Sequence, residues 1–211
     1  MSKPFEYSNT ITASVGMLLS YIGFIFIIIT GIQYGSYWNL IWSILYGVTL
    51  ILLHTSSTLY HGIMHANTKK KFRLMDQSCI YLLIAGTYTP IALINLYGIF
   101  GLSIFSVIWS LSILGIFLKI KNIQPFQNFE VFLCLFMGWF ALIGIKELVN
   151  SMDINGMILI FLGGLFFSIG ILFYISKTLR YGHAIWHLFY IFGCICHYFT
   201  IVLYTMPHKI I

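Results

Sequence analysis

Charged residues are scarce in this chain. They make up 8% of the 211 residues, with five acidic and eleven basic side chains, whereas hydrophobic residues make up 60%. A soluble domain carries charges on about a quarter of its residues, so this composition excludes an ordinary water-soluble enzyme or binding domain. It is typical of a chain that lies in a lipid bilayer.

Cysteine is too rare, and wrongly placed, for a disulfide framework. The four cysteines all fall in apolar stretches, and no Cys-x-x-Cys pair is present. Cys194 and Cys196 are two positions apart, so they point to different sides of a helix. We therefore expect the cysteines, which are Cys79, Cys134, Cys194 and Cys196, to pack as buried side chains.

Long polar segments are also missing. A helix needs about 20 mostly apolar residues to cross about 30 Å of hydrocarbon, and seven stretches meet this requirement. They are residues 11–30, 38–60, 74–96, 99–118, 129–149, 156–176 and 184–206. Only short connections remain between them. The sequence predicts an all-α integral membrane protein in which residues 1–211 form a single seven-transmembrane helix bundle.

The basic residues predict how this bundle is oriented. Short cytoplasmic loops of membrane proteins hold the excess of Lys and Arg. With the N-terminus inside, nine of the eleven fall in inner segments, and only Lys146 and Lys209 fall outside. The nine are Lys3, Lys69, Lys70, Lys71, Arg73, Lys119, Lys121, Lys177 and Arg180. We therefore predict a cytoplasmic N-terminus and a C-terminus outside.

The net charge of +6 is explained by this topology and by attraction to anionic lipid head groups. No nucleic-acid-binding motif accompanies the charge, so we expect no nucleic-acid partner. The first stretch lacks the basic segment and the cleavage site of a signal peptide, and we treat it as a retained helix. Residues 1–9 are expected to lie along the cytoplasmic surface or to be disordered.

Four ionisable residues lie at the predicted cytoplasmic ends of the apolar stretches: His61, Asp76, His183 and His187. Such groups are costly within a membrane, by about 2.5–3.5 kcal/mol for Asp at a helix centre, and they mark functional sites. His183 and His187 are four residues apart and project from one helix face. His61 adds a third nitrogen from another helix. Three such ligands suit a zinc site with one open coordination position.

Two other polar residues are expected near this site. Asp76 follows the basic segment 62–73, which we expect to be a loop, and either ligates the metal or hydrogen-bonds to its water. The second role is favoured, because the aspartate need not displace a histidine. Ser57 lies four residues before His61, on the same helix face.

The interior histidines have weaker claims to the site. His54 is two turns before His61 and could line a cavity above the metal, although a hydrogen-bonded interior histidine is the favoured interpretation. His197 lies deep in the last stretch, where an unpaired imidazole would be costly. We expect it to hydrogen-bond across the bundle.

Four motifs in sequence order resemble those of a known family. They are Ser57-Ser-Thr-Leu-Tyr-His61, Asp76-Gln77-Ser78, Gly86-Thr-Tyr-Thr-Pro90 and His183-Ala-Ile-Trp-His187. Together with His197, they make the chain similar to the bacterial haemolysin III proteins from about Thr10 to Met206. These proteins are relatives of the progestin and adipoQ receptors and, more distantly, of the alkaline ceramidases. The resemblance implies a seven-helix bundle, with zinc held by His61, His183 and His187 and with Asp76 near the metal-bound water. We expect this bundle to lie in the inner (plasma) membrane.

The leading functional prediction is a zinc-dependent membrane hydrolase with Zn²⁺ as cofactor and Asp76 and Ser57 as catalytic side chains. Membrane lipids surround the site, so a lipid amide or ester is the expected substrate. One alternative is a cytolytic, pore-forming protein, although seven apolar helices argue against a toxin that must first be soluble. Another alternative is a zinc-stabilised sensor or regulator in which Ser57 and Asp76 complete a closed polar network.

Overall fold

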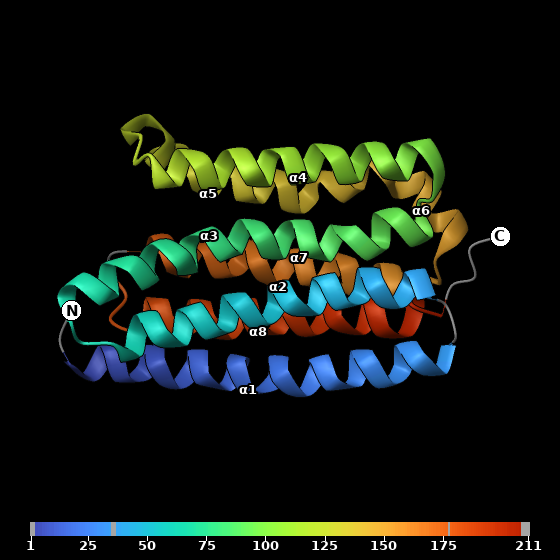
Figure 1. Cartoon of the computed structure of the whole chain (residues 1–211). Helices are drawn as coiled ribbons and strands as arrows, with labels where there is room; N and C mark the ends of the chain where they lie inside the picture. The colour runs from blue at the N-terminus through green and yellow to red at the C-terminus, as the bar shows by residue number, and fades with distance from the viewer. Residues whose placement is uncertain (1–2, 35–36, 177, 208–211) are drawn as a thin grey trace.

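Every regular element of the computed structural model is helical within the residues that it describes, which are 3–34, 37–176 and 178–207. The helices lie side by side with their long axes roughly parallel (Figure 1). Within these residues, seven helices are long and apolar enough to cross a membrane. This confirms the predicted all-α, seven-helix membrane fold. The spans are Glu6–Gln33, Tyr37–Gly62, Ala66–Asn95, Gly98–Ile120, Phe129–Ser151, Ile154–Ile175 and Gly182–Thr205.

Four of the spans are single helices and three contain a change of helix type. The single helices are α1 (Lys3–Tyr34), α2 (Tyr37–Gly62), α4 (Gly98–Ile120) and α7 (Ile154–Ile175). The third and seventh spans end in wider π turns, as α3 (Ala66–Pro90) with η1 (Ile91–Asn95), and α8 (Gly182–Phe199) with η3 (Thr200–Thr205). The fifth span consists of α5 (Gln124–Trp139), the 3₁₀ turn η2 (Phe140–Gly144) and α6 (Ile145–Ser151).

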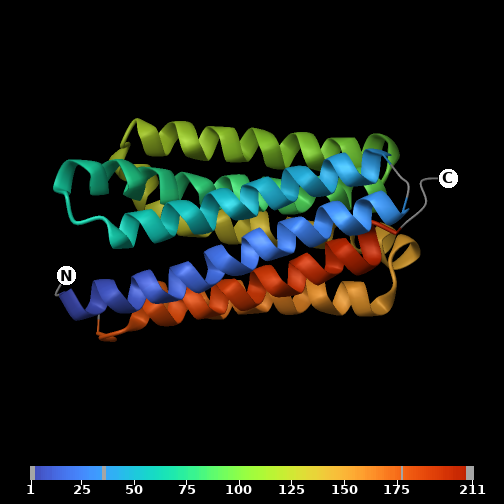
Figure 2. The same cartoon turned by 60° about the horizontal axis from the view of Figure 1, so that its bottom comes forward.

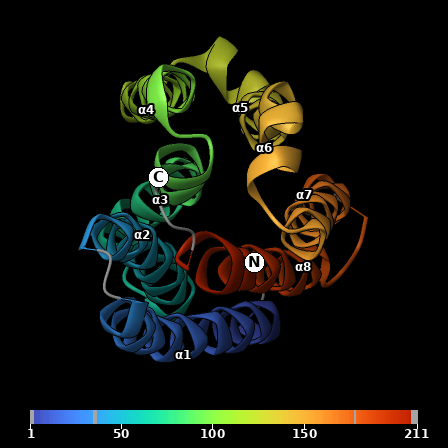
Figure 3. The same ribbon diagram turned by 90° about the vertical axis from the view of Figure 1, so that its right-hand side faces the viewer.

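The spans follow one another around a ring in chain order, as the end-on view shows (Figure 3). α1 packs against both α2 and α8 and so closes the ring (Figure 2). Large apolar side chains such as Ile32, Ile99 and Leu172 are exposed on the outside. Such side chains would be unfavourable in water in these numbers, and in a bilayer they face lipid.

The break in the fifth span is stabilised by a tyrosine from α3. Tyr88 Oη donates to the Gly138 carbonyl at 3.0 Å and accepts from the Ala141 amide at 2.7 Å. In lipid, backbone groups that a broken helix leaves unpaired must find partners within the protein. Tyr88 supplies both a donor and an acceptor at this point.

Two expected helix starts were wrong. α1 begins at Lys3 and not at residue 11, so the described part of residues 1–9 is helical, while residues 1–2 lie outside the described residues. α3 begins at Ala66, so the basic residues of the expected loop 62–73 lie on a helix, and residues 63–65 connect it to α2. Apolar stretches reveal only the part of a helix that lies within the membrane. Lys and Arg are good helix formers, and they extend α3 beyond that part.

The start of α1 and the end of η3 lie at opposite ends of the bundle (Figure 1). The basic start of α3 and the basic end of α4 lie at the same end as the start of α1.

We predict that a reporter fused after Lys121 is cytoplasmic and that one fused after Ile211 is outside, because the Lys and Arg excess faces the cytoplasm. Protease protection or a compartment-specific reporter measures this. Both fusions reporting the same side would contradict a seven-span topology.

Candidate metal centre

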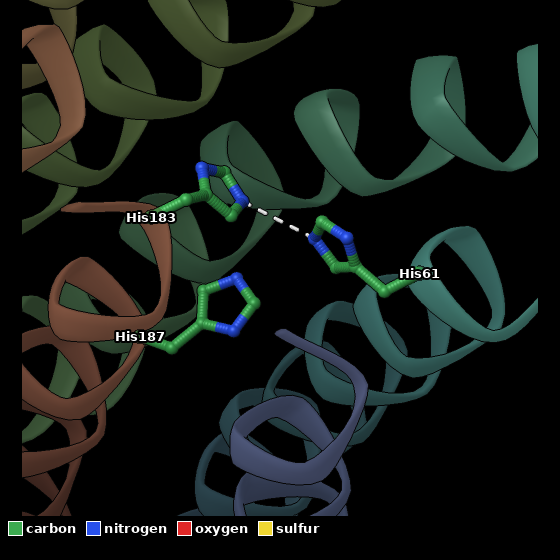
Figure 4. Close-up of side chains that lie close together, drawn as sticks. All are labelled: His61, His183 and His187. Carbon is green, nitrogen blue, oxygen red and sulfur yellow. Dashed lines mark hydrogen bonds between the residues drawn. The ribbon is translucent and has the colours of Figure 1, made fainter. Parts of the chain in front are cut away.

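Three histidines meet at one end of the bundle. His61 lies in the last turn of α2, and His183 and His187 lie in the first turns of α8. One nitrogen from each ring lies within 4.8 Å of the others, and the rings face a common point (Figure 4). His61 Nε2 and His183 Nε2 are 3.2 Å apart. Two nitrogens bound tetrahedrally to one zinc at about 2.0–2.1 Å would be about 3.3 Å apart. The His61–His183 pair already has this spacing, and the three residues together could hold a metal ion.

Chain direction and helix period bring these rings together. α2 ends, and α8 begins, at the same end of the bundle. The spacing of four residues then puts His183 and His187 on one face of α8, with ring centroids 4.7 Å apart. Gly182 allows the tight approach from α7, since a Cβ there would lie 2.8 Å from the Phe173 carbonyl oxygen. The structure therefore assembles the three histidines that the sequence singled out.

The far sides of two of these rings contact α1. Glu6 Oε2 lies 3.1 Å from His61 Nδ1 and 3.4 Å from Lys69 Nζ. Thr12 Oγ1 lies 2.9 Å from His187 Nδ1. Neither contact was predicted from the sequence, because the first helix was expected to begin at residue 11 and residues 1–9 to lie outside the bundle. The scarcity of acidic residues was the signal that could have found Glu6.

Asp76 and Ser57 line the same cavity as the three histidines. Ser57 is buried on α2 and lies near the Asp76 carboxylate on α3, to which its hydroxyl can donate. Asp76 is not one of the residues whose ligand atoms cluster within 4.8 Å. It lies inside α3, and the expectation that it directly follows a loop was wrong. The arrangement leaves the carboxylate at the cavity wall.

The cavity has a volume of about 350 Å³ and lies between α2, α3, α5, α7 and α8. It extends from the histidine cluster to His197. His197 is ten residues after His187 on α8 and so lies about 15 Å deeper. Arg73, Asp76 and Gln77 line the histidine end. The walls are mainly apolar, with Leu83, Ile84, Phe167 and Ile171 among them. This shape suits an elongated apolar molecule with a polar group at the histidines.

The two interior histidines are hydrogen-bonded. His54 Nδ1 lies 2.9 Å from the Leu50 carbonyl oxygen, and His54 does not line the cavity of the histidine cluster, so the interior interpretation is confirmed. His197 Nε2 lies 3.3 Å from the Ile160 carbonyl oxygen on α7, which confirms the predicted bond across the bundle. All four cysteines are free, and none belongs to the histidine cluster.

Comparison with known proteins agrees with the sequence motifs. The family described as haemolysin-III related matches residues 1–198. The chain is 41% identical over 201 residues to the "Hemolysin-3 homolog" of Bacillus subtilis (strain 168), which covers 95% of this chain and 94% of that protein. It is 38% identical over 202 residues to "Hemolysin-3" of Bacillus cereus, which covers 96% and 92%. With the human "Monocyte to macrophage differentiation factor" it shares 28% identity over 178 residues, covering 81% and 74%. The chain therefore belongs to the haemolysin III-related family of integral membrane proteins.

Proposed function

We propose that this protein is a zinc-dependent membrane hydrolase that cleaves an amide or ester bond of a lipid. One observation carries the proposal: three histidine nitrogens converge at one end of an elongated, mainly apolar cavity inside the bundle. A ligand pocket with apolar walls and a few convergent polar groups is the usual form of a small-molecule site. Here the polar groups are also metal ligands.

The donor set favours zinc. Imidazole suits zinc, copper, iron and nickel, and a set of three histidines with one open position is a common form of catalytic zinc site. Structural zinc sites use four protein ligands, whereas catalytic sites use three and keep one position open. Bound zinc would polarise a carbonyl group and activate water. His61, His183 and His187 would hold the metal at the polar end of the cavity.

The remaining residues of the cavity have separate tasks in hydrolysis. The apolar walls hold the lipid chain, so its carbonyl carbon lies near the histidines. Asp76 accepts a proton from water as the new carbon–oxygen bond forms, and passes it to the leaving nitrogen or oxygen as the old bond breaks. The Ser57 hydroxyl donates to Asp76 and orients its carboxylate. The products are a fatty acid and an amine or alcohol.

The setting of the site follows from the membrane fold. We place the protein in the inner (plasma) membrane with the histidine cluster toward the cytoplasm, because the basic residues gather at that end of the bundle. Membrane lipids then reach the cavity as substrates. No nucleic-acid partner is proposed.

Two other functions are compatible with this fold. The names of the Bacillus relatives contain the word hemolysin, which favours direct lysis by a pore. The hydrogen bond between Ser57 and Asp76 favours a closed polar network in a non-catalytic sensor. Conductance of purified protein in planar bilayers tests the first of these, and metal-dependent turnover separates the hydrolase from the sensor.

The purified protein should hold about one zinc per chain, because three imidazoles supply one catalytic-type site. His187→Ala removes one ligand and should lower both zinc content and thermal stability, since metal binding is linked to folding. His197→Ala is the matched control for zinc content, because this histidine lies on the same helix outside the cluster. Elemental analysis and thermal melting give the readouts. Unchanged zinc content in the single alanine variants of His61, His183 and His187 would eliminate this site.

Asp76→Asn should separate chemistry from metal binding. Asparagine keeps the shape and one acceptor oxygen but removes the basic carboxylate. Zinc should stay bound, while release of fatty acid from a ceramide or another acyl amide in bilayers should fall by about 10²–10⁴-fold, as expected for the loss of a general base. The hydrolase proposal is wrong if zinc-loaded wild-type protein releases no more fatty acid than Asp76→Asn.

A further inference from the structure

The first turns of α1 contact two of the three histidines, one on α2 and one on α8. Glu6 approaches His61 of α2, and Thr12 approaches His187 of α8, in each case at the Nδ1 atom. The Nε2 atoms point the other way, toward the centre of the cluster (Figure 4). The His61 side chain is 1% exposed and that of Glu6 is 13% exposed, so water competes little for this contact.

The surroundings of Thr12 favour the His187 tautomer that carries its proton on Nδ1. A threonine hydroxyl has a single proton to donate. Thr12 Oγ1 lies 3.0 Å from the Ser8 carbonyl oxygen and 3.1 Å from the Asn9 carbonyl oxygen, and both can only accept. The hydroxyl proton therefore goes to a backbone carbonyl, and the Thr12 oxygen accepts from His187 Nδ1–H. His187 Nε2 then has a free lone pair that faces the cluster.

Glu6 acts in the same way on His61. A carboxylate can only accept, so His61 Nδ1 carries the proton and Nε2 is bare. The bare His61 Nε2 lies 3.2 Å from His183 Nε2. Two imidazole nitrogens approach this closely only if a proton or a cation lies between them. The Glu6 carboxylate would also place negative charge near a divalent ion held by His61.

We propose that Glu6 and Thr12 are positioning residues of the metal centre, and that α1 sets its zinc affinity through His61 and His187. This inference deepens the proposed function and rests on it for the identity of the metal. Hydrogen-bond partners on the far side of ligating histidines typically change metal affinity about 10–100-fold. The first helix of the bundle is then part of the metal centre, although it supplies none of the three histidines.

Glu6 has a second contact, which allows a purely structural explanation to be tested. Its carboxylate lies 3.4 Å from Lys69 Nζ and so also fastens α1 to the start of α3. Lys69→Met removes this ion pair between α1 and α3 and leaves the contact between Glu6 and His61 in place. If Glu6 only held helices together, Lys69→Met and Glu6→Gln would have the same effect.

The test uses the full-length protein in detergent or nanodiscs and measures zinc affinity by competition with a chromophoric chelator. We expect Glu6→Gln and Thr12→Val to weaken zinc binding about 10–100-fold. Thr12→Ser keeps the hydroxyl and should bind zinc as wild type does. Lys69→Met should bind zinc at least as tightly as wild type, because Glu6 then has no competing cation. Melting of the metal-free proteins shows whether each variant is folded.

Three outcomes would overturn the inference. Zinc affinity in Glu6→Gln and Thr12→Val equal to wild type would show that α1 does not act on the metal, while the proposed function would stand. Equal losses of zinc affinity in Glu6→Gln and Lys69→Met would show that Glu6 only holds α1 against α3. Equal losses of zinc affinity in Thr12→Ser and Thr12→Val would show that the Thr12 hydroxyl does not act on the metal centre. Absence of zinc binding in wild type would instead contradict the metal centre and the proposed function together.

Discussion

A buried imidazole nitrogen inside a membrane bundle is unfavourable when it lacks a partner. This constraint governs the end of the bundle where α2 ends and α8 begins. His61 and His187 are each 2% exposed, so neither can rely on water. α1 supplies a partner for Nδ1 of each ring. The Nε2 atoms of His61 and His187 point toward the centre of the cluster, where a bound cation would satisfy both at once.

The same constraint explains why the helices continue beyond their apolar parts. Asn9 is 2% exposed, so the first turns of α1 lie against protein rather than along the membrane surface. Glu6 and Lys69 then form an ion pair between the starts of α1 and α3. At the middle of the bundle, Tyr88 pairs the backbone groups that the break between α5 and η2 exposes. Irregular backbone at membrane depth is tolerated where protein groups satisfy it, and here it borders the cavity.

Much of this arrangement could be predicted from the sequence, because lipid imposes simple rules. The seven spans follow from the length of the apolar stretches. The alternating direction of consecutive spans brings His61 to the same end as His183, and the spacing of four residues puts His187 on the same face of α8. Ser57 and Asp76 were placed near the cluster by the same reasoning, and both line the cavity.

The starts of α1 and α3 could not be predicted, because polar turns that pack against protein look like loops in a hydropathy pattern. The contact between Glu6 and His61 joins residues 55 positions apart. It depends on how far α1 extends and on which helices it packs against. The role of Thr12 depends on its distances to two carbonyl oxygens of α1 and to His187 of α8, and the contact with α8 arises only in the folded protein.

X-ray absorption at the zinc edge of the purified wild-type protein tests the central claim most directly, because it reports the atoms around the metal. The account predicts a shell of three imidazole nitrogens at about 2.0–2.1 Å, together with an oxygen from water. A sulfur shell at about 2.3 Å would contradict the account, because it would move the metal to the cysteines. A shell with fewer than three imidazoles would also contradict it.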